Sequence, residues 1–418
     1  MKVFHFTNYY PNLHSIWGGA ERACQQTVTL LKNKNVTNYI ATLSHKQASQ
    51  SNFFIIPTLE HFLPLLLKDI CKNFKLLIFP FDFIAFISSF IFFKKIKPDI
   101  IHLHNFNLMS FAPLVAAKFL KIPTVLSIYD YWYFCPQEML MKKDGTICHE
   151  FQGFRCLSCY EPGRFALIKK FSLFFRKHIF NFFLSFVDQF IVLSNASRKI
   201  LLSYGIKDSK ITILKQPVEV NLKKVDFSKI EEGLILFVGW KVKRKGLHLL
   251  LHAFKLIAKE MENVKLIAIG KNIDKEHLKS VNDYINNNGL SDKVKMFDRI
   301  SQEELDSYWE KANVFVVPEQ WENMSPLVVL EAMANGRAIV ASNLGGIPEF
   351  IENGKTGFLA EYNNPRDFAD KIVKLLKDRS LVEKIGKAAN EKIRDFCEPE
   401  TFVNDQIKLY ERIVNNAK

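Results

Sequence analysis

The sequence has 418 residues, of which 48% are hydrophobic and 24% are charged, with 17 glycines and 15 prolines. This length is more than one hydrophobic core usually organises, and the composition excludes a disordered chain, a collagen and a disulfide scaffold. Charge and aromatic content are uneven, since residues 1–212 hold 25 Lys and Arg against 12 Asp and Glu and contain 28 of the 38 phenylalanines, whereas the remainder is nearly neutral.

Short apolar runs alternate with helical stretches along the whole chain, which is typical of a parallel α/β architecture. The strands that this pattern predicts in the first half are Lys2–Thr7, Ile100–His104, Thr124–Tyr129, Phe190–Ser194 and Lys210–Leu214. The strands predicted in the second half are Leu234–Gly239, Val264–Gly270, Val294–Phe297, Val314–Pro318 and Ala338–Ser342. We therefore expect two doubly wound domains that face each other and bind ligands where the carboxyl ends of the strands meet.

A polar, charged stretch at residues 216–230 is the natural linker between the two series of strands. It separates an N-terminal domain, residues 1–215, from a C-terminal domain, residues 231–395. The last helix, residues 396–418, is expected to cross back to the first domain. The opening residues lack the apolar core of a signal peptide, so the sequence predicts a cytoplasmic protein.

Two segments bear on membrane contact. Leu76–Phe93 is an apolar run of 18 residues that contains Pro80 and Asp82, which favours a buried or interface-lying helix over a membrane span. The segment Arg164–Val187 holds five Lys and Arg, many phenylalanines and no acidic residue. Such a helix can lie in the headgroup region of an anionic membrane, and the alternative is a core helix whose lysines reach water.

We favour peripheral contact of this basic helix, residues 164–187, with the inner face of the cytoplasmic membrane. Nucleic acid would also attract positive charge, but no recognised nucleic-acid-binding motif accompanies it, so no nucleic-acid partner is expected.

The most informative segment is Val314–Gly346, in which a predicted buried strand is followed by a loop and a helix. Ser325 is the expected N-cap, Pro326 the first helical residue and Leu327 the start of an apolar face, and a stop signal follows at Asn335–Gly336. Backbone N–H groups at the start of a helix attract phosphate, so the segment predicts an anion site.

Two glutamates accompany this helix start: Glu322 lies in the preceding loop and Glu331 lies on the helix. One carboxylate would accept the hydroxyls of a sugar and the other those of a ribose, which predicts a nucleotide-sugar site. The alternative is that both are solvated surface charges, the usual fate of glutamate.

The pattern P-x-x-W-E-N-x-S-P-L-x-V-L-E-A-M-A-x-G, followed by Gly345–Glu349, resembles family four of the retaining glycosyltransferases. Further segments resemble motifs of that family in the same order, and these are Gly18–Glu21, Pro98–His102, Phe237–Gly246 and Gly354–Phe358. The resemblance covers nearly the whole chain. It implies the GT-B fold, an α/β architecture of two Rossmann-like domains that face each other across a cleft.

The resemblance also implies roles for single residues. In the family, the lysine of the G-x(5)-K-G loop stabilises the departing nucleoside diphosphate, and that role falls to Lys245. Glu331 would bind the ribose hydroxyls and Glu322 the donor sugar. The backbone around Ile300 would contact the base.

Other donor-side positions are less regular. Gly18 and Gly19 would let backbone N–H groups approach the diphosphate, although a tight turn needs glycine as well. Trp240 stands where the family often has arginine, so Lys243 or Arg244 would supply that charge. Nothing in the donor segment supplies a cation site of the Asp-x-Asp type, and we expect catalysis without a metal or another cofactor.

Two further positions depart from the family pattern. Glu322 and Glu331 have eight residues between them, where the family usually has seven, so either the loop is longer or Asn323 takes the place of the first glutamate. The family often has a His-Asp pair where this chain has Tyr129–Asp130. Asp130 and, as a substitute for the missing histidine, His104 are therefore the acceptor-side candidates.

Four cysteines lie within the predicted insert 131–163, namely Cys135, Cys148, Cys156 and Cys159. Four thiolates with one C-x-x-C pair can close a tetrahedral zinc site, which here would be structural. Reduced thiols without a ligand are an equal alternative.

The sequence thus predicts a retaining hexosyltransferase that uses a UDP- or GDP-sugar and a glycan or lipid-linked acceptor, as in capsule, O-antigen or lipopolysaccharide synthesis. One alternative is a GT-B phosphorylase or sugar-phosphate synthase. Another is a non-catalytic protein that binds a nucleotide-sugar or a polyanion.

Overall fold

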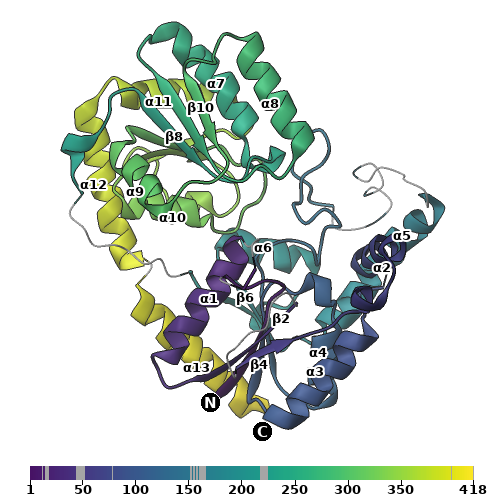
Figure 1. Cartoon of the computed structure of the whole chain (residues 1–418). Helices are drawn as coiled ribbons and strands as arrows, with labels where there is room; N and C mark the ends of the chain where they lie inside the picture. The colour runs from purple at the N-terminus through teal and green to yellow at the C-terminus, as the bar shows by residue number, and fades with distance from the viewer. Residues whose placement is uncertain are drawn as a thin grey trace. The chain divides into compact units, whose positions relative to one another are not determined.

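The computed structural model describes residues 1–11, 13–14, 18–43, 52–77, 79–150, 153, 156, 159, 166–216, 225–396 and 398–417. The chain forms two compact units (Figure 1). Unit 1 consists of Met1–Pro217 and Pro399–Lys418, and unit 2 consists of Val218–Glu398. The last helix therefore belongs to the same unit as the first strand.

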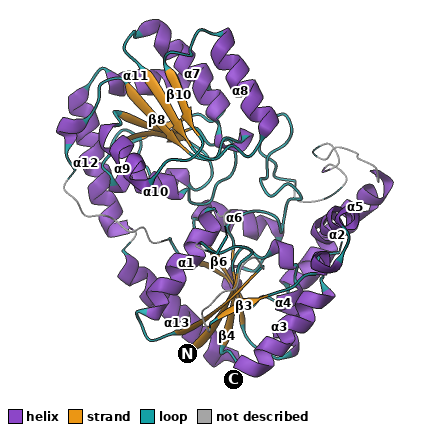
Figure 2. Ribbon diagram, in the orientation of Figure 1, coloured by secondary structure: helices purple, strands orange, loops and turns teal. Residues whose placement is uncertain are grey.

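Unit 1 contains a seven-stranded parallel sheet with the strand order β3-β2-β1-β4-β5-β6-β7. Figure 2 shows strands in orange and helices in purple. The central strands of this sheet are buried on both faces, as short apolar runs in a parallel sheet predict. The strands are β1 (Lys2–Phe6), β2 (Thr37–Thr42), β3 (Phe53–Ile55), β4 (Ile100–Leu103), β5 (Thr124–Ser127), β6 (Gln189–Val192) and β7 (Ile211–Ile213).

Helices cover both faces of this sheet. On one face, α1 and α13 pack against the strands through Leu31, Val403 and Tyr410, and on the other Phe93 of α3 meets the rings of Phe4 and Phe6. The helices of unit 1 are α1 (Gly19–Lys32), α2 (Leu65–Leu77), α3 (Phe83–Ile96), α4 (Ala112–Phe119), α5 (Ala166–Leu184), α6 (Asn195–Tyr204) and α13 (Pro399–Ala417).

Unit 2 has a six-stranded parallel sheet with the strand order β10-β9-β8-β11-β12-β13. Its strands are β8 (Leu234–Val238), β9 (Lys265–Ile269), β10 (Val294–Phe297), β11 (Val314–Val317), β12 (Ala338–Ser342) and β13 (Phe358–Ala360).

The helices of unit 2 form two layers. One hydrophobic core contains residues of α7, α8 and α11, and a second contains residues of α9, α10 and α12. These helices are α7 (Leu247–Glu260), α8 (Lys275–Asn287), α9 (Gln302–Lys311), α10 (Leu327–Ala334), α11 (Pro365–Leu376) and α12 (Arg379–Phe396).

The ten predicted strands all form, with ends that differ by at most two residues from those expected. The strands missing from the prediction are Thr37–Thr42, Phe53–Ile55 and Phe358–Ala360. Thr37–Thr42 is half polar in sequence, and the other two contain three residues each, too few to show a period.

The prediction of one helix over Leu76–Phe93 is wrong. Helix α2 ends at Leu77 and α3 begins at Phe83, because Pro80 interrupts the run and Asp82 caps α3 by accepting hydrogen bonds from the N–H groups of Ile84 and Ala85. Within the described part of the chain, none of the helices has the length and apolar content to cross a membrane.

The predicted basic helix is only partly the amphipathic surface helix that was expected. Arg164 lies outside the described residues, and Arg176 of α5 is fully buried. Its guanidinium donates to the carbonyl oxygen of Trp132 and lies 3.6 Å from the centre of the Phe180 ring. Arg176 therefore anchors α5 to the unit and does not face solvent.

Candidate functional site

The strand order of unit 2 marks where a ligand would bind. Strands β9 and β10 lie on one side of β8, and β11, β12 and β13 lie on the other. Open parallel sheets bind ligands beside such a switch point, at the carboxyl ends of the strands, because the loops there diverge. The segments that follow β8 and β11, residues 239–246 and 318–326, contain the predicted lysine loop and the start of the predicted anion-binding helix.

Glycines let the loop after β8 lie close to its neighbours. Gly246 has a φ of +75°, and a Cβ atom there would lie 1.7 Å from the carbonyl oxygen of Pro318. A Cβ atom at Gly270 would lie 2.0 Å from the carbonyl oxygen of Gly239. Only glycine fits these positions. The two glycines therefore allow the lysine loop to pack closely against the ends of β9 and β11.

Lys245 is fixed by a carboxylate to which the sequence assigned no role. Its ammonium nitrogen lies 2.5 Å from Oε1 of Glu319, the second residue after β11. Glu319 is buried and also accepts hydrogen bonds from the indole N–H of Trp321 and the side-chain amide of Asn323, the latter at 3.1 Å. The ion pair and the two hydrogen bonds thus give the carboxylate partners in place of water.

Arg244 joins the same loop. Its carbonyl oxygen accepts a hydrogen bond of 2.8 Å from the N–H of Gln320. Its guanidinium lies 5.6 Å from the centre of the Trp321 ring, and the ammonium of Lys245 lies 5.8 Å from it. Two cationic side chains therefore flank one indole ring at the switch point.

The helix after this loop begins one residue later than predicted. The first residue of α10 is Leu327, and its N-cap is Pro326, because the backbone of Pro326 stays extended. Ser325 is therefore not the cap: its N–H donates to Oδ1 of Asn323 at 3.3 Å, and its buried hydroxyl has no hydrogen-bond partner among the described residues. Such a hydroxyl, beside helix N–H groups that lack an intrahelical partner, is suited to hold an anionic ligand.

A glycine turn after β12 supports the loop that contains Glu322. Gly345 has a φ of +60°, and a Cβ atom there would lie 2.5 Å from the carbonyl oxygen of Asn323 and 3.0 Å from the carbonyl carbon of Glu322. The N–H of Gly346 donates to the same Asn323 oxygen at 2.7 Å. The Gly345–Gly346 pair noted in the sequence therefore positions this loop by close backbone contact.

The remaining donor-side candidates are Glu331, Glu322 and Ile300. Glu331 is one turn beyond Leu327 in α10, so both half-buried side chains lie on the same face of the helix. Glu322 is half-buried in the loop, and Ile300 directly precedes Ser301, the N-cap of α9. The assignment of donor sugar, ribose and base to these residues stays a prediction.

The predicted glycine loop of unit 1 uses one of its N–H groups internally. Gly18 is the N-cap of α1, and its N–H donates to Oε2 of Glu21 at 2.8 Å. The other carboxylate oxygen of Glu21 accepts from the side-chain amide of Asn105. Gly19 is the first residue of α1 and is exposed, so of the two glycines it is the one at the surface.

His104 lies in a buried cluster with His5 and His102, and all six ring nitrogens lie within 3.2 Å of a protein partner. His102 contacts the hydroxyls of Ser127 and Tyr410, at 2.8 Å and 2.6 Å. His104 is fully buried in this cluster, and the acceptor-side role assigned to it stays a prediction.

The hydrogen bonds determine which ring nitrogens carry protons. The side-chain amide of Asn38 donates to the carbonyl oxygen of Val36, so its oxygen accepts from Nε2 of His5. Nδ1 of His5 must then accept from Nε2 of His104, whose Nδ1 accepts from the hydroxyl of Tyr129. Burial lowers the pKa of His5 to about 4 and that of His104 well below its usual value, so both are neutral at pH 7.

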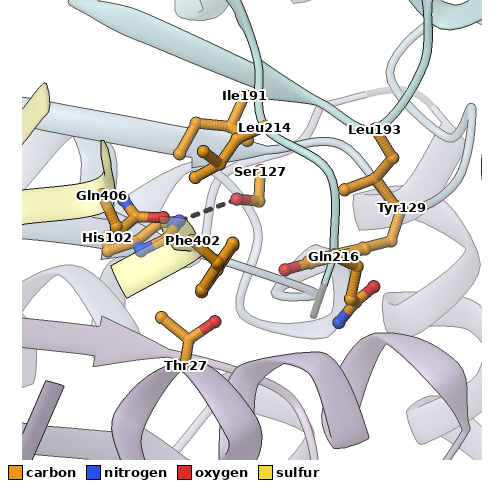
Figure 3. Close-up of a pocket in the computed structure, with 10 residues that line it drawn as sticks. All are labelled: Thr27, His102, Ser127, Tyr129, Ile191, Leu193, Leu214, Gln216, Phe402 and Gln406. Carbon is orange, nitrogen blue, oxygen red and sulfur yellow. Dashed lines mark hydrogen bonds between the residues drawn. The ribbon is translucent and has the colours of Figure 1, made fainter. Parts of the chain in front are cut away.

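The Tyr129–Asp130 pair is half-buried at the end of β5. Asp130 accepts a hydrogen bond of 2.9 Å from the N–H of Trp132, which shapes the start of the cysteine-containing insert. Behind Tyr129 lies a small cavity, also lined by His102 and by Gln406 of α13 (Figure 3). Its volume of about 10 Å³ holds roughly one water molecule, so it is not a sugar site.

The four cysteines of the insert are free and partly exposed. Burial raises the pKa of the Cys156 thiol, and the neighbouring thiols of Cys135, Cys148 and Cys159 raise it further. A zinc ion would neutralise the charges that these thiols carry when they ligate as thiolates. Among the described residues, the group with ligand atoms all within 4.8 Å is the histidine cluster, so the thiols would have to close further around an ion.

Comparison with protein families gives two consecutive matches. Residues 17–222 match the model described as Glycosyltransferase Family 4, and residues 221–392 match that of Glycosyl transferases group 1. Together the two matches span the strands of both units from β2 to β13.

Curated relatives share up to about a third of aligned residues. The capsular polysaccharide biosynthesis glycosyltransferase CapM of Staphylococcus aureus is 30% identical over 55% of this chain and 63% of its own length. The diacetylbacillosaminyl-diphospho-undecaprenol alpha-1,3-N-acetylgalactosaminyltransferase of Campylobacter jejuni is 25% identical over 61% of this chain and 72% of its own length. A spore coat protein of Bacillus subtilis is 30% identical, and the match spans 48% of that relative.

Solved structures with the same fold cover almost the whole chain. The HepE protein of Anabaena in complex with UDP has a TM-score of 0.71 at 15% identity, with 99% of this chain and 100% of that one covered. Sucrose-phosphate synthase of Thermosynechococcus elongatus has a TM-score of 0.74 at 16% identity, with 99% of both chains covered. The two family matches and this pair of parallel-sheet domains show that the chain belongs to glycosyltransferase family 4 and has the GT-B fold.

Proposed function

We propose that the protein transfers a hexosyl group from a UDP- or GDP-sugar to a glycan or lipid-linked acceptor, with retention of the anomeric configuration. The observation that carries this proposal is the arrangement at the switch point of unit 2. There Lys245 is fixed by buried Glu319 beside the loop that leads to α10, and the buried hydroxyl of Ser325 lacks a partner among the described residues. This combination of a cation, a hydroxyl and helix N–H groups suits a pyrophosphate.

In the proposed reaction, the bond between the anomeric carbon and the diphosphate oxygen breaks as the acceptor hydroxyl forms a new bond on the same face of the sugar. Negative charge grows on the leaving diphosphate, where Lys245 and the start of α10 stabilise it. The departing phosphate oxygen takes the proton of the acceptor hydroxyl. Glu322 would hold the donor sugar and Glu331 the ribose hydroxyls, and the chain's own residues supply these contacts without a catalytic metal.

The relatives support the choice of substrates. The Anabaena protein binds UDP and has also been crystallised with UDP-glucose, which supports a UDP-sugar donor. The relatives named for capsular polysaccharide biosynthesis and for a diphospho-undecaprenol acceptor support a role in cell-surface glycan assembly. A lipid-linked acceptor would place the protein in the cytoplasm, at the inner face of the cytoplasmic membrane.

A sugar-phosphate synthase is the second candidate, because sucrose-phosphate synthase shares the fold over 99% of the chain. A sugar-phosphate synthase would require a soluble sugar phosphate as acceptor, and a phosphorylase would require inorganic phosphate. Product analysis with each acceptor class separates these candidates from a transferase that acts on a lipid-linked glycan.

The test is an assay with UDP- and GDP-sugars labelled in the hexose, each offered with extracted lipid-linked glycans, hexose phosphates or phosphate. We expect label in the lipid-linked product and an α-linkage from an α-linked donor, as determined by NMR. Replacement of Glu331 by Ala should abolish transfer, whereas Glu303→Ala on the exposed side of α9 should not. Binding without transfer to any acceptor, equal in both variants, would support the non-catalytic alternative.

We also propose that Cys135, Cys148, Cys156 and Cys159 bind one structural zinc ion. Their spacing in a short insert, with one C-x-x-C pair, supports this ligand set, and all four are free thiols. An ion here would stabilise the insert and take no part in the transfer step.

A further inference from the structure

Unit 1 has a surface on which large apolar side chains are exposed side by side. Phe79, Phe83, Ile87, Ile91 and Phe119 have exposed fractions of 47%, 66%, 42%, 56% and 71%. We call these five residues the apolar face. They come from the α2–α3 connection, from α3 and from the end of α4, and none of them belongs to the candidate donor site.

The pattern along α3 shows that the exposure is systematic. Phe83, Ile87 and Ile91 are spaced four residues apart and therefore form one stripe along the helix. The opposite side of α3 contains the buried residues Ala85 and Phe93 and packs on the rest of unit 1. An ordinary surface helix carries polar residues on its outer side, so α3 has apolar residues where solvent contact would predict charge.

Ring contacts connect the stripe to its neighbours. The Phe86 ring lies 6.4 Å from that of Phe83, 5.9 Å from that of Phe119 and 5.8 Å from that of Phe81, whose ring is 6.3 Å from that of Phe79. Helices α3 and α4 also pack side by side (Figure 1). The apolar face is therefore continuous, and a contiguous patch of this kind marks an interaction site.

The charges around the apolar face are positive. Lys94 and Lys95 continue the stripe at the C-terminal end of α3, and Lys118 directly precedes Phe119. The ammonium of Lys94 lies 4.7 Å from the centre of the Phe90 ring, and that of Lys118 lies 6.0 Å from the centre of the Phe186 ring. The side chains of Lys94, Lys95 and Lys118 are all exposed, and the ammonium groups of Lys94 and Lys118 lie over aromatic rings at the surface.

Acidic groups do not offset this charge within the two helices, since α3 and α4 contain none. Nearby Asp82 is buried, where it caps α3 and pairs with Lys75, which also pairs with Glu60. The exposed acidic residues of this region are Asp69 on α2, Asp99, which accepts a hydrogen bond from the N–H of Lys2, and Asp188, which accepts one from the N–H of Thr124. They are outnumbered by the exposed lysines of α3, α4 and the residues that follow them, which are Lys94, Lys95, Lys97, Lys118 and Lys121. The rim of the apolar face is therefore net positive.

From these observations we infer that the apolar face inserts into the headgroup region of an anionic lipid bilayer, with α3 as its centre. Exposed rings and isoleucines enter the acyl boundary, and Lys94, Lys95 and Lys118 contact the anionic headgroups. A second copy of the chain is a poorer partner, because pairing this face with itself would oppose the same lysines. The inference rests on the proposed function to the extent that a lipid-linked acceptor requires the protein to reach a membrane.

This surface differs from the one that the sequence indicated. The prediction relied on the basic residues of residues 164–187, but Arg176 is an internal anchor. The centre of the apolar face is α3, which lies mostly within the run Leu76–Phe93. Sequence analysis interpreted that run as a buried or interface-lying helix. If the apolar face of α3 and α4 binds lipid, substitutions on it should change lipid binding without disturbing the fold. A substitution of Arg176 should not have this effect.

The test is co-sedimentation of the full chain with vesicles of phosphatidylcholine alone and with 30% phosphatidylglycerol. We expect binding to the anionic vesicles only, and the triple variant Phe83→Gln, Ile87→Gln, Ile91→Gln should bind at least tenfold more weakly. The matched control is Ile273→Gln, which removes an exposed isoleucine of unit 2. Circular dichroism and the melting temperature verify that each variant is folded.

A second pair of variants tests the charged rim. Lys94→Gln with Lys95→Gln should weaken binding to anionic vesicles by at least threefold and reduce its salt dependence. The same charge change at exposed Lys275 and Lys279 of α8 should leave binding unchanged. Equal binding by wild type and both sets of face variants would overturn the inference, as would a concentration-dependent dimer that the triple variant abolishes.

The same variants separate this inference from the proposed function. Donor hydrolysis in the absence of lipid should be unchanged in the triple variant, because α3 carries none of the proposed donor-site residues. Loss of vesicle binding with normal hydrolysis supports the inference. Vesicle binding by a protein that neither hydrolyses nor transfers any sugar would support the docking surface and contradict the proposed function alone.

Discussion

Glu319 shows how one residue can organise a site without resembling a motif. Its carboxylate bonds to Lys245 from the loop after β8 and to Trp321 and Asn323 from its own loop. The sequence places Glu319 only as a loop residue after a strand, because its partner lies 74 residues away. Lys245 could be named as a candidate because it lies in a glycine-flanked motif, but the carboxylate that pairs with it could not be named from the sequence.

At the residue scale, Lys245→Gln should lower kcat at least a hundredfold, because it removes the cation opposite the charge that grows on the leaving diphosphate. Steady-state assays with the labelled donor measure this effect. Lys259→Gln, at the exposed end of α7, is the control and should behave as wild type. A Lys245→Gln variant with an unchanged kcat and a raised KM would contradict this expectation. It would show that the lysine binds the donor and the transition state equally.

Most of the strands and helices that position the candidate site could be predicted from the sequence. The short apolar strands of both sheets follow directly from the sequence pattern. Strand β2 could not, because the alternation of polar and apolar residues in Thr37–Thr42 is weak and its burial comes from neighbouring elements. The start of α10 was misplaced by one residue, since Pro326 fits both the first helical position and an extended cap.

A glycine in the turn after β12 provides a prediction at this scale. Gly345→Ala should destabilise unit 2 and weaken donor binding, because a Cβ atom would lie 2.5 Å from the carbonyl oxygen of Asn323. Gly289→Ala is a matched control with a similar φ of +64° and open space around it, so it should cost only about 1 kcal/mol of backbone strain. Urea unfolding measures both, and equal losses would contradict a positioning role for Gly345.

The cysteine insert gives a second prediction for a single element. Purified protein should contain one zinc ion per chain by mass spectrometry, and a chelator should lower the melting temperature, since metal binding contributes to folding. The variant Cys156→Ser, Cys159→Ser should lose the metal. Cys71→Ser, outside the insert, should retain it, and metal-free wild type with an unchanged melting curve would contradict the zinc proposal.

At the scale of the whole molecule, the sequence predicts a doubly wound sheet in each of two units. It also predicts that the last helix returns to the first unit. The buried histidine cluster of unit 1 was not predictable as a unit, because His5 and His104 are distant in sequence and meet only when β1 pairs with β4. The neighbouring contact between Tyr410 and His102 depends on α13 in the same way. Polar networks of this kind require the tertiary structure.

This cluster predicts how stability depends on pH. The pKa of His5 is lowered to about 4, and those of His102 and His104 are well below their usual value, so the unfolded chain binds more protons than the folded one below about pH 6.5. The free energy of unfolding should therefore be highest above pH 6.5 and fall toward pH 4, by about 1.4 kcal/mol per pH unit for each histidine. Urea titrations at pH 7.5, 6 and 5 measure this loss.

The measurement that tests the central claim most directly is a calorimetric titration of the full chain with UDP and GDP, repeated with Lys245→Gln. If a pyrophosphate binds between Lys245 and the start of α10, the wild type should bind either UDP or GDP. The variant should bind the same nucleotide at least tenfold more weakly. Lys259→Gln should bind as wild type does. Equal affinity of wild type and Lys245→Gln, or binding of neither nucleotide, would contradict the proposed site.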